Sequence, residues 1–190
     1  MTANHVGEVI ESSTRGFVAR SQNVGESPHF GYFVKTKGEP VVYGLVYEII
    51  TESKEPGRKP TTYGMSIEEL RSEQPQIFEL LKTEFHALVI AHSEQGRTRF
   101  SLPPLPPPIY SFVYECGKEE IEKLTSQDFF LRAIISSPNV PVDDLIIASL
   151  RYAQDSREFD KGYIVRMGKS LARIFKDDYE RLSSVLRRII

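Results

Sequence analysis

The sequence of 190 residues has no tryptophan, a single cysteine and no long apolar run. One cysteine, Cys116, excludes an intrachain disulfide and is typical of a protein in a reducing compartment. No apolar run approaches the roughly 18 residues that a membrane-spanning helix requires. The opening residues also lack the basic stretch and apolar core of a signal peptide. We therefore expect a globular protein of the cytoplasm.

The chain also lacks a strong excess of either charge, since its formal net charge is −2. Nucleic-acid-binding domains are commonly basic, because the phosphate backbone attracts Lys and Arg. A net negative balance excludes an attraction of the whole surface to nucleic acid. Any such binding would have to use a local basic patch.

Residue patterns for metal binding and catalysis are missing as well. The sequence has no HExxH or CxxC spacing. His86 and His92 would lie about 20 Å apart on one regular strand, so they cannot share an ion. No nucleophile elbow accompanies the many combinations of Ser, His and Asp that the chain offers. We expect no enzymatic activity, no cofactor and no metal ion, and we assign no catalytic residue.

What the chain does have is an uneven distribution of residue types around Gly117. Ten of the twelve Gly and ten of the twelve Pro lie at or before Gly117, whereas every Asp follows it. Gly and Pro punctuate turns between short strands, and Asp is typical of helix starts. The sequence thus predicts an α+β protein with a β module at residues 1–117 and an α-helical domain at residues 118–190.

The first module is expected to be a small closed or nearly closed β-barrel. Short segments rich in β-branched and aromatic residues recur between turn signals, the longest being Pro40–Ile50. Gly44 within it indicates the bend or bulge that a closing barrel needs. The capping box Ser66–Glu69 predicts a helical insertion at about residues 64–83. The expected strands are 6–12, 15–20, 31–36, 40–50, 85–92, 97–100 and 109–114.

A proline-rich segment, Pro103–Pro108, favours extended polyproline II structure. It has two interpretations: a ligand for a proline-recognition module, or a stiff connector across the end of the barrel. We favour the connector, because apolar strands flank the segment closely on both sides.

After Gly117 the apolar period changes from that of strands to that of helices. Thr125–Asp128 has the pattern of a second capping box. The last predicted helix is the longest. Its apolar residues follow alternating steps of four and three, except for a skip at Asp178 and Tyr179. The expected helices are 118–124, 129–136, 142–154 and 162–189.

Gly168-Lys169-Ser170 matches the end of a phosphate-binding loop, which needs Gly, four residues and then Gly-Lys-Ser or Gly-Lys-Thr. Here the first position falls on Tyr163, and bulky side chains occupy the intervening residues. The segment also lies inside a helical pattern with no strand before it. We expect an ordinary helix with Gly168 at a close contact, and no ATP binding by the chain on its own.

Four basic residues recur at steps of three and four along the last predicted helix: Arg166, Lys169, Arg173 and Lys176. One interpretation is a contact surface for nucleic acid or an acidic partner. The other, which we favour, is a solvated helix face whose charges are balanced by nearby carboxylates. No aromatic residue interleaves the row, as single-strand binding by stacking would require.

Three short segments of the β module resemble HAS-barrel domains, the barrel type of HerA-like ATPases and rotary ATP synthase subunits. Val6–Thr14 together with Phe17–Ala19 is similar to the opening of such domains. Tyr43–Tyr47 is similar to the strand in which they carry a Gly between apolar residues. The resemblance covers about residues 5–115. It implies a barrel that caps a motor domain, with neighbouring barrels holding the motor ring together.

The helical part departs from this family, because residues 118–190 carry no phosphate loop and no acidic strand end for magnesium. The ATPase activity is therefore not implied. We expect a non-enzymatic interaction or assembly module, an adaptor for a HerA-like or related ring ATPase, in which self-association is also an option. The alternative is a nucleic-acid-binding accessory protein in DNA processing that uses the basic last helix.

Overall fold

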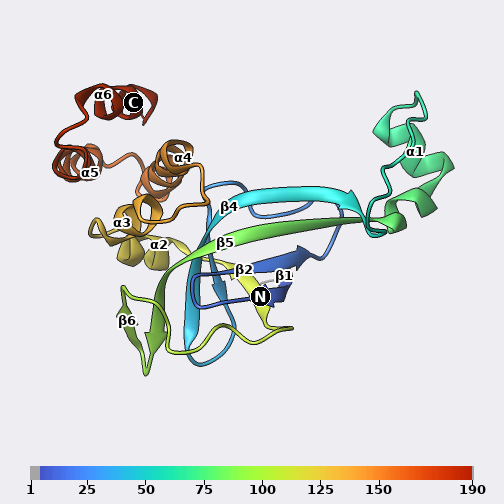
Figure 1. Cartoon of the computed structure of the whole chain (residues 1–190), viewed down its shortest axis with the longest axis horizontal. Coiled ribbons are helices and arrows are strands. Elements are labelled where there is room, and N and C mark those ends of the chain that lie inside the picture. The colour runs from blue at the N-terminus through green and yellow to red at the C-terminus, as the bar shows by residue number, and fades with distance from the viewer. Residues whose placement is uncertain (1–4, 190) are drawn as a thin grey trace.

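The computed structural model describes residues 5–189 and has an α+β architecture (Figure 1). A closed antiparallel β-barrel carries a helical C-terminal region, as the sequence predicts. The strands are β1 (Gly7–Ser12), β2 (Gly16–Ser21), β3 (Phe33–Thr36), β4 (Val41–Ser53), β5 (Leu81–Glu94), β6 (Arg97–Arg99) and β7 (Phe112–Glu115). The helices are α1 (Ile67–Glu73), the 3-10 helix η1 (Pro75–Leu80), α2 (Lys118–Leu124), α3 (Phe129–Ile135), α4 (Val142–Asp155), α5 (Lys161–Ile174) and α6 (Tyr179–Ile189).

The barrel closes because β2 pairs with both of its neighbours in space. The strand order is β2-β1-β7-β3-β4-β5, and β2 returns to pair with β5 from Gly16↔Leu88 to Arg20↔Glu84. Strand β6 pairs with β5 alone, as the second strand of a short hairpin outside the closed ring. Alternating side chains fill the barrel interior with Val9, Phe17, Val34, Val46, Phe85 and Val113.

Gly44 lies where β4 bends to close the barrel. The pairing of β4 with β5 shifts register between Tyr43 and Gly44, which confirms the predicted irregularity. A Cβ atom at position 44 would lie 3.0 Å from the Phe17 ring and 2.9 Å from the Ala87 Cβ. Glycine is therefore needed here for a close approach of side chains inside the barrel.

The helical region packs on the barrel through a core that continues across Gly117. Phe33 of β3 lies against Phe130 of α3, with 6.0 Å between ring centroids, and Tyr32 stacks on Tyr152 of α4 at 3.7 Å. The backbone of Gly31 approaches α4 so closely that an added Cβ would lie 2.5 Å from the Ala148 Cβ. One hydrophobic cluster thus includes residues of both parts. Gly117 as a domain boundary stays a prediction.

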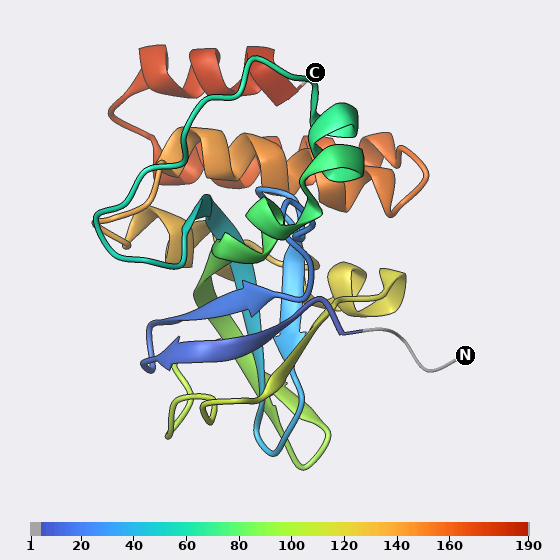
Figure 2. The same ribbon diagram turned by 90° about the vertical axis from the view of Figure 1, so that its right-hand side faces the viewer.

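Figure 2 shows the helices α4, α5 and α6 lying to one side of the barrel strands. The chain turns between them at short loops, and buried side chains such as Leu145, Leu171 and Val185 fill the space between the helices. Within residues 5–189, no helix is both long enough and apolar enough to cross a membrane.

The single long helix expected at 162–189 is wrong, because the chain breaks into α5 and α6. Helix α5 ends at Ile174, and Phe175 leaves helical geometry with its side chain buried. Asp178 then starts α6, since its carboxylate accepts a hydrogen bond of 3.0 Å from the Arg181 N–H. The skip in the apolar pattern at Asp178 and Tyr179 marks this break.

The predicted capping box at Thr125–Asp128 is also wrong. Thr125 instead ends α2, where its hydroxyl donates a 2.6 Å hydrogen bond to the carbonyl of Ile121. Helix α3 begins after Asp128, whose side chain makes no capping hydrogen bond and pairs with Arg132. A hydroxyl can bond to a carbonyl one turn back as well as to an N–H one turn ahead, so the pattern alone does not decide between the two.

The proline-rich segment lies between β6 and β7 and supports the connector interpretation. Pro103 and Pro107 are buried. The Ser12 hydroxyl donates a 2.6 Å hydrogen bond to the carbonyl of Pro107, which attaches the segment to the end of β1. A proline-recognition module would need access to these proline side chains, which are buried here.

Candidate functional site

A long two-stranded arm extends from the barrel and carries α1 and η1 at its tip (Figure 1). Strands β4 and β5 pair with each other as far as Ser53↔Leu81. On the outer sides, β3 pairs with β4 only at residues 43–45, and β2 pairs with β5 only at residues 84–88. Between these points and the tip, no third strand within the described residues 5–189 pairs with β4 or β5. The arm therefore lies outside the closed sheet.

The tip of the arm, residues 54–80, has no buried side chain. Apolar residues nevertheless gather there around a hollow of about 200 Å³, whose lining includes Leu70, Ile77 and Phe78. Three large side chains at the tip are strongly exposed: Tyr63 (44 %), Ile67 (62 %) and Leu80 (49 %). Adjacent exposed apolar side chains on a projecting element are typical of a protein-binding surface.

Contacts within residues 54–80 hold the tip together, and none of them involves the barrel. Ser66 caps α1: its hydroxyl accepts from the Glu69 N–H at 3.2 Å, and its own N–H donates to the Glu69 carboxylate at 2.7 Å. This backbone hydrogen bond lowers the pKa of Glu69. Arg71 lies over the Phe78 ring at 5.0 Å and joins α1 to η1. The predicted capping box is confirmed.

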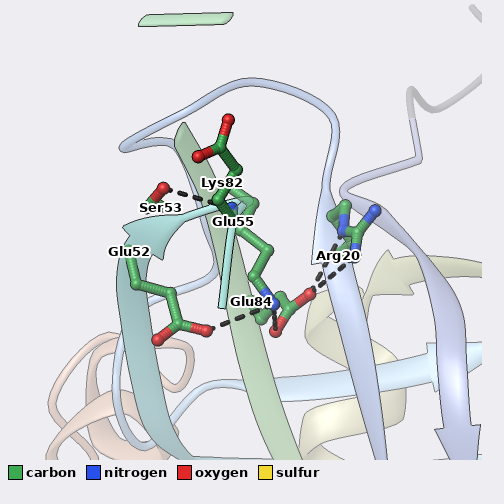
Figure 3. A network of polar contacts seen from close by, with 6 residues as sticks. All are labelled: Arg20, Glu52, Ser53, Glu55, Lys82 and Glu84. Carbon is green, nitrogen blue, oxygen red and sulfur yellow. Dashed lines mark hydrogen bonds and ion pairs between the residues drawn. The ribbon is translucent and has the colours of Figure 1, made fainter. Parts of the chain in front are cut away.

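A cluster of charged side chains fixes the base of the arm to the barrel (Figure 3). Arg20 of β2 donates two hydrogen bonds, of 3.1 and 2.9 Å, to one carboxylate oxygen of Glu84 on β5. Lys82 donates a 3.0 Å hydrogen bond to the other oxygen of Glu84 and lies 3.2 Å from Glu52 on β4. Three strands are thus held together where the arm leaves the barrel.

The protonation of this cluster follows from its geometry. Burial alone would raise the pKa of Glu84, but the hydrogen bonds from Lys82 and Arg20 outweigh it, and the net pKa is lowered. The hydrogen bond to Glu84 raises the pKa of Lys82. Both groups are therefore charged at neutral pH, and the ion pairs at the base of the arm are formed.

The basic residues predicted as a row lie in two places. Arg166, Lys169 and Arg173 share one face of α5, whereas Lys176 follows the end of that helix. All four are exposed. The first three line a groove of about 650 Å³ between α5 and residues 126–128, which we call the basic groove. Because the predicted long helix is broken, its four-residue row does not form a continuous helical face.

Gly168-Lys169-Ser170 lies in the middle of α5, as the sequence predicts. Its backbone N–H groups belong to the hydrogen bonds of the helix, so they cannot cradle a phosphate as a phosphate-binding loop does. A Cβ at Gly168 would lie 3.6 Å from the Leu186 side chain, an ordinary van der Waals distance, so α6 packs on this turn without requiring glycine there.

A second hollow, of about 410 Å³, lies between the barrel and the α3–α4 loop. Its lining includes Tyr47, His86 and Asn139. The Ser12 and Ser13 hydroxyls at its edge are hydrogen-bonded to main-chain carbonyls. The hollow therefore offers polar contacts but no serine hydroxyl activated by a neighbouring base.

Within residues 5–189, no three or more His, Cys, Asp and Glu side chains gather in a way that could hold a metal ion. His92 is buried, and its Nδ1 lies 3.0 Å from the carbonyl of Ser101. His86 lies on the same strand, with its Nδ1 3.8 Å from Glu48. The two histidines therefore have separate partners.

Comparison of the chain with models of protein families and with curated proteins finds no match. The functions of the arm tip and the basic groove are therefore inferred from their geometry. They lie on different elements of the fold, the first on the β4–β5 ribbon and the second on the helical region (Figure 1).

Proposed function

We propose that this chain is a non-enzymatic assembly protein that binds a partner protein through the arm tip, residues 54–80. The observation that carries the proposal is the absence of any buried side chain in this segment, although it contains two helices and several large apolar residues. Short helices are marginal in water without tertiary packing. A binding partner would supply the packing that the rest of the chain does not.

The base of the arm supports the same proposal. A two-stranded ribbon alone is marginally stable, yet here a charged cluster and a hydroxyl pair brace it. The Thr51 and Thr83 hydroxyls lie 2.8 Å apart, and Thr83 also accepts a 2.8 Å hydrogen bond from the Gly25 N–H. A braced ribbon presents its tip in a defined direction, which lowers the entropy lost on binding.

The partner that we propose is a HerA-like or related ring ATPase. The support is the resemblance of Val6–Thr14, Phe17–Ala19 and Tyr43–Tyr47 to HAS-barrel domains, which cap such motors. Because the barrel is closed, few of its strand edges are free to pair with another barrel. We therefore place the contact at the arm tip rather than along the barrel wall.

The test removes the tip without disturbing the ribbon. Ser53 and Leu81 are paired residues, so a two-residue Asn-Gly turn in place of residues 54–80 closes the hairpin in register. The full-length and shortened proteins are mixed with a HerA-type ATPase from the same organism, and binding is measured by biolayer interferometry. We expect the shortened protein to lose binding at least about 100-fold, because the deletion removes the whole proposed contact.

A matched pair of triple variants distinguishes a specific contact at the tip from nonspecific hydrophobic association. Tyr63→Ser, Ile67→Ser and Leu80→Ser remove the exposed apolar residues of the tip. Leu102→Ser, Leu105→Ser and Tyr179→Ser remove apolar residues elsewhere that are exposed to a similar or greater extent. Only the first set should weaken binding. Equal binding by both triple variants and the full-length protein would reject the arm as the contact.

Nucleic-acid binding remains the alternative proposal, with less support. The basic groove gathers three cations, but its lining contains no aromatic side chain on which bases could stack. Neutralising Arg166, Lys169, Arg173 and Lys176 together should abolish a salt-dependent affinity for DNA or RNA. If the native protein shows no such affinity at low salt, this alternative is rejected.

A further inference from the structure

The basic groove lies on the helical region and takes no part in the proposed arm contact. One wall is α5 and the other is the α2–α3 connection, residues 126–128. Arg166, Lys169 and Arg173 fall within an arc of about 60° on α5 and span about 10 Å along its axis, at 3.6 residues per turn and 1.5 Å per residue. Three positive side chains therefore border one concave surface.

The positive charge of the groove is not balanced locally. Asp128 is the only acidic residue in the lining, and its carboxylate is engaged by Arg132 at 3.1 Å. Arg166 lies 3.9 Å from Asp160, at the outer limit of an ion pair. Lys169 forms no ion pair with the residues that the structure describes, 5–189. Lys169 and Arg173 thus keep their charges for a ligand, and that of Arg166 is only partly balanced by Asp160.

The uncharged lining also favours a ligand that only accepts hydrogen bonds. Ser170 is buried, and its oxygen accepts a 3.0 Å hydrogen bond from Arg173, which leaves its O–H free to donate. Gln127 lies in the opposite wall, and its side-chain amide carries N–H groups that can donate to a ligand. Met167 and Ala172 contribute apolar surface, which excludes water and strengthens charge-assisted hydrogen bonds.

We propose that the basic groove is a binding site for a diphosphate group, either free or as part of a small phosphorylated molecule. Phosphoryl oxygens accept several hydrogen bonds each, and Arg engages them in pairs. A spread of about 10 Å along α5 exceeds the size of a single phosphoryl group and suits two linked ones. The absence of an aromatic side chain in the lining disfavours recognition of a base or of a stacked single strand.

The site does not work as a phosphate-binding loop. Lys169 and Ser170 contribute through their side chains, while their backbone N–H groups stay within the helix. Binding therefore depends on Arg166 and Arg173 as much as on Lys169, and it should weaken with added salt because the three cations are exposed.

The test uses isothermal titration calorimetry with the full chain at low salt and without divalent ions. Pyrophosphate should bind saturably, with a Kd below about 1 mM. Arg166→Gln combined with Arg173→Gln should weaken it at least about tenfold, because charge-assisted hydrogen bonds are lost. The control, Arg97→Gln with Arg99→Gln, removes two exposed arginines of β6 and should bind as the native chain does. Circular dichroism checks that each variant is folded.

Titrations with other ligands identify which chemical group the basic groove recognises. ADP binding within about threefold of pyrophosphate assigns the affinity to the diphosphate group, and inorganic phosphate should bind at least about fivefold more weakly. Much tighter binding of ADP would overturn the proposal in favour of a nucleoside site. A single-stranded oligonucleotide that binds when pyrophosphate does not would overturn it in favour of nucleic acid. No saturable binding of pyrophosphate below about 10 mM, or equal losses in the control variant, would also overturn it.

Discussion

Removal of the arm tip should leave the fold as stable as before. The shortened protein has an Asn-Gly turn between Ser53 and Leu81 in place of residues 54–80. No side chain in the deleted segment is buried, so little apolar surface returns to water when it is lost. The capping box of Ser66 and the contact of Arg71 with Phe78 lie wholly within the deleted segment. They stabilise the tip itself and not the barrel.

The magnitude follows from two opposing effects. A connection of about 27 residues is shortened to two, which lowers the entropy cost of closing the hairpin by up to about 2 kcal/mol. The 2.8 Å hydrogen bond from the Lys54 N–H to the Leu80 carbonyl is lost, at a cost of about 1 kcal/mol. The free energy of unfolding should therefore stay the same or rise by up to about 1 kcal/mol.

The assay is urea unfolding followed by far-ultraviolet circular dichroism, because the chain has no tryptophan for fluorescence. Phe130→Ala serves as the calibration. Its fully buried ring packs on Phe33 where the barrel meets the helical region, so the substitution should cost about 3 to 5 kcal/mol. If the shortened protein also loses more than about 2 kcal/mol, the tip contributes to the core and the reasoning is refuted.

Three further predictions test other parts of the structure. Glu84→Gln should cost about 1 to 3 kcal/mol at pH 7. Because the folded state lowers the pKa of Glu84, this cost should shrink progressively as the pH falls below the ordinary Glu value and through the lowered pKa, as measured by urea unfolding at pH 7 and at successively lower pH. Burial raises the pKa of the Cys116 thiol. At pH 8 this thiol should therefore react with a thiol reagent at least about 100-fold more slowly in the native protein than in the urea-unfolded protein. Equal rates in the two states would contradict the burial of Cys116. Gly31→Ala should destabilise the protein by at least about 1 kcal/mol more than Gly25→Ala, since both residues have a positive φ but only Gly31 is packed against α4; equal losses in thermal unfolding would argue against this packing.

The fold was predictable where one local signal decides the structure. The strands begin and end within a few residues of the predicted ones, because a period of two and turn residues at their ends specify them. Gly44 was predictable as a bulge, since a glycine inside an apolar strand has few other uses. The long last helix was not predicted correctly, because its apolar stripe continues almost in phase across the break at Phe175–Asp178.

The candidate sites depend more on tertiary structure. The helical insertion was predicted from Ser66 and Glu69, but its projection from the barrel depends on which strands pair beyond Glu84, and no local pattern specifies that. The charged cluster joins Arg20 to Glu84, which are 64 positions apart. Arg166, Lys169 and Arg173 were identified from their spacing, whereas the groove also requires residues 126–128 of another element.

The most direct test of the proposed function is the affinity of a HerA-type ATPase for the full-length chain and for the chain with residues 54–80 replaced by Asn-Gly. We predict that the full-length chain binds, and that the shortened chain, with its unfolding free energy unchanged or slightly higher, binds at least about 100-fold more weakly. Equal affinity of the two proteins, or no binding of the full-length chain, would contradict the proposal that the arm tip docks this protein on a ring ATPase.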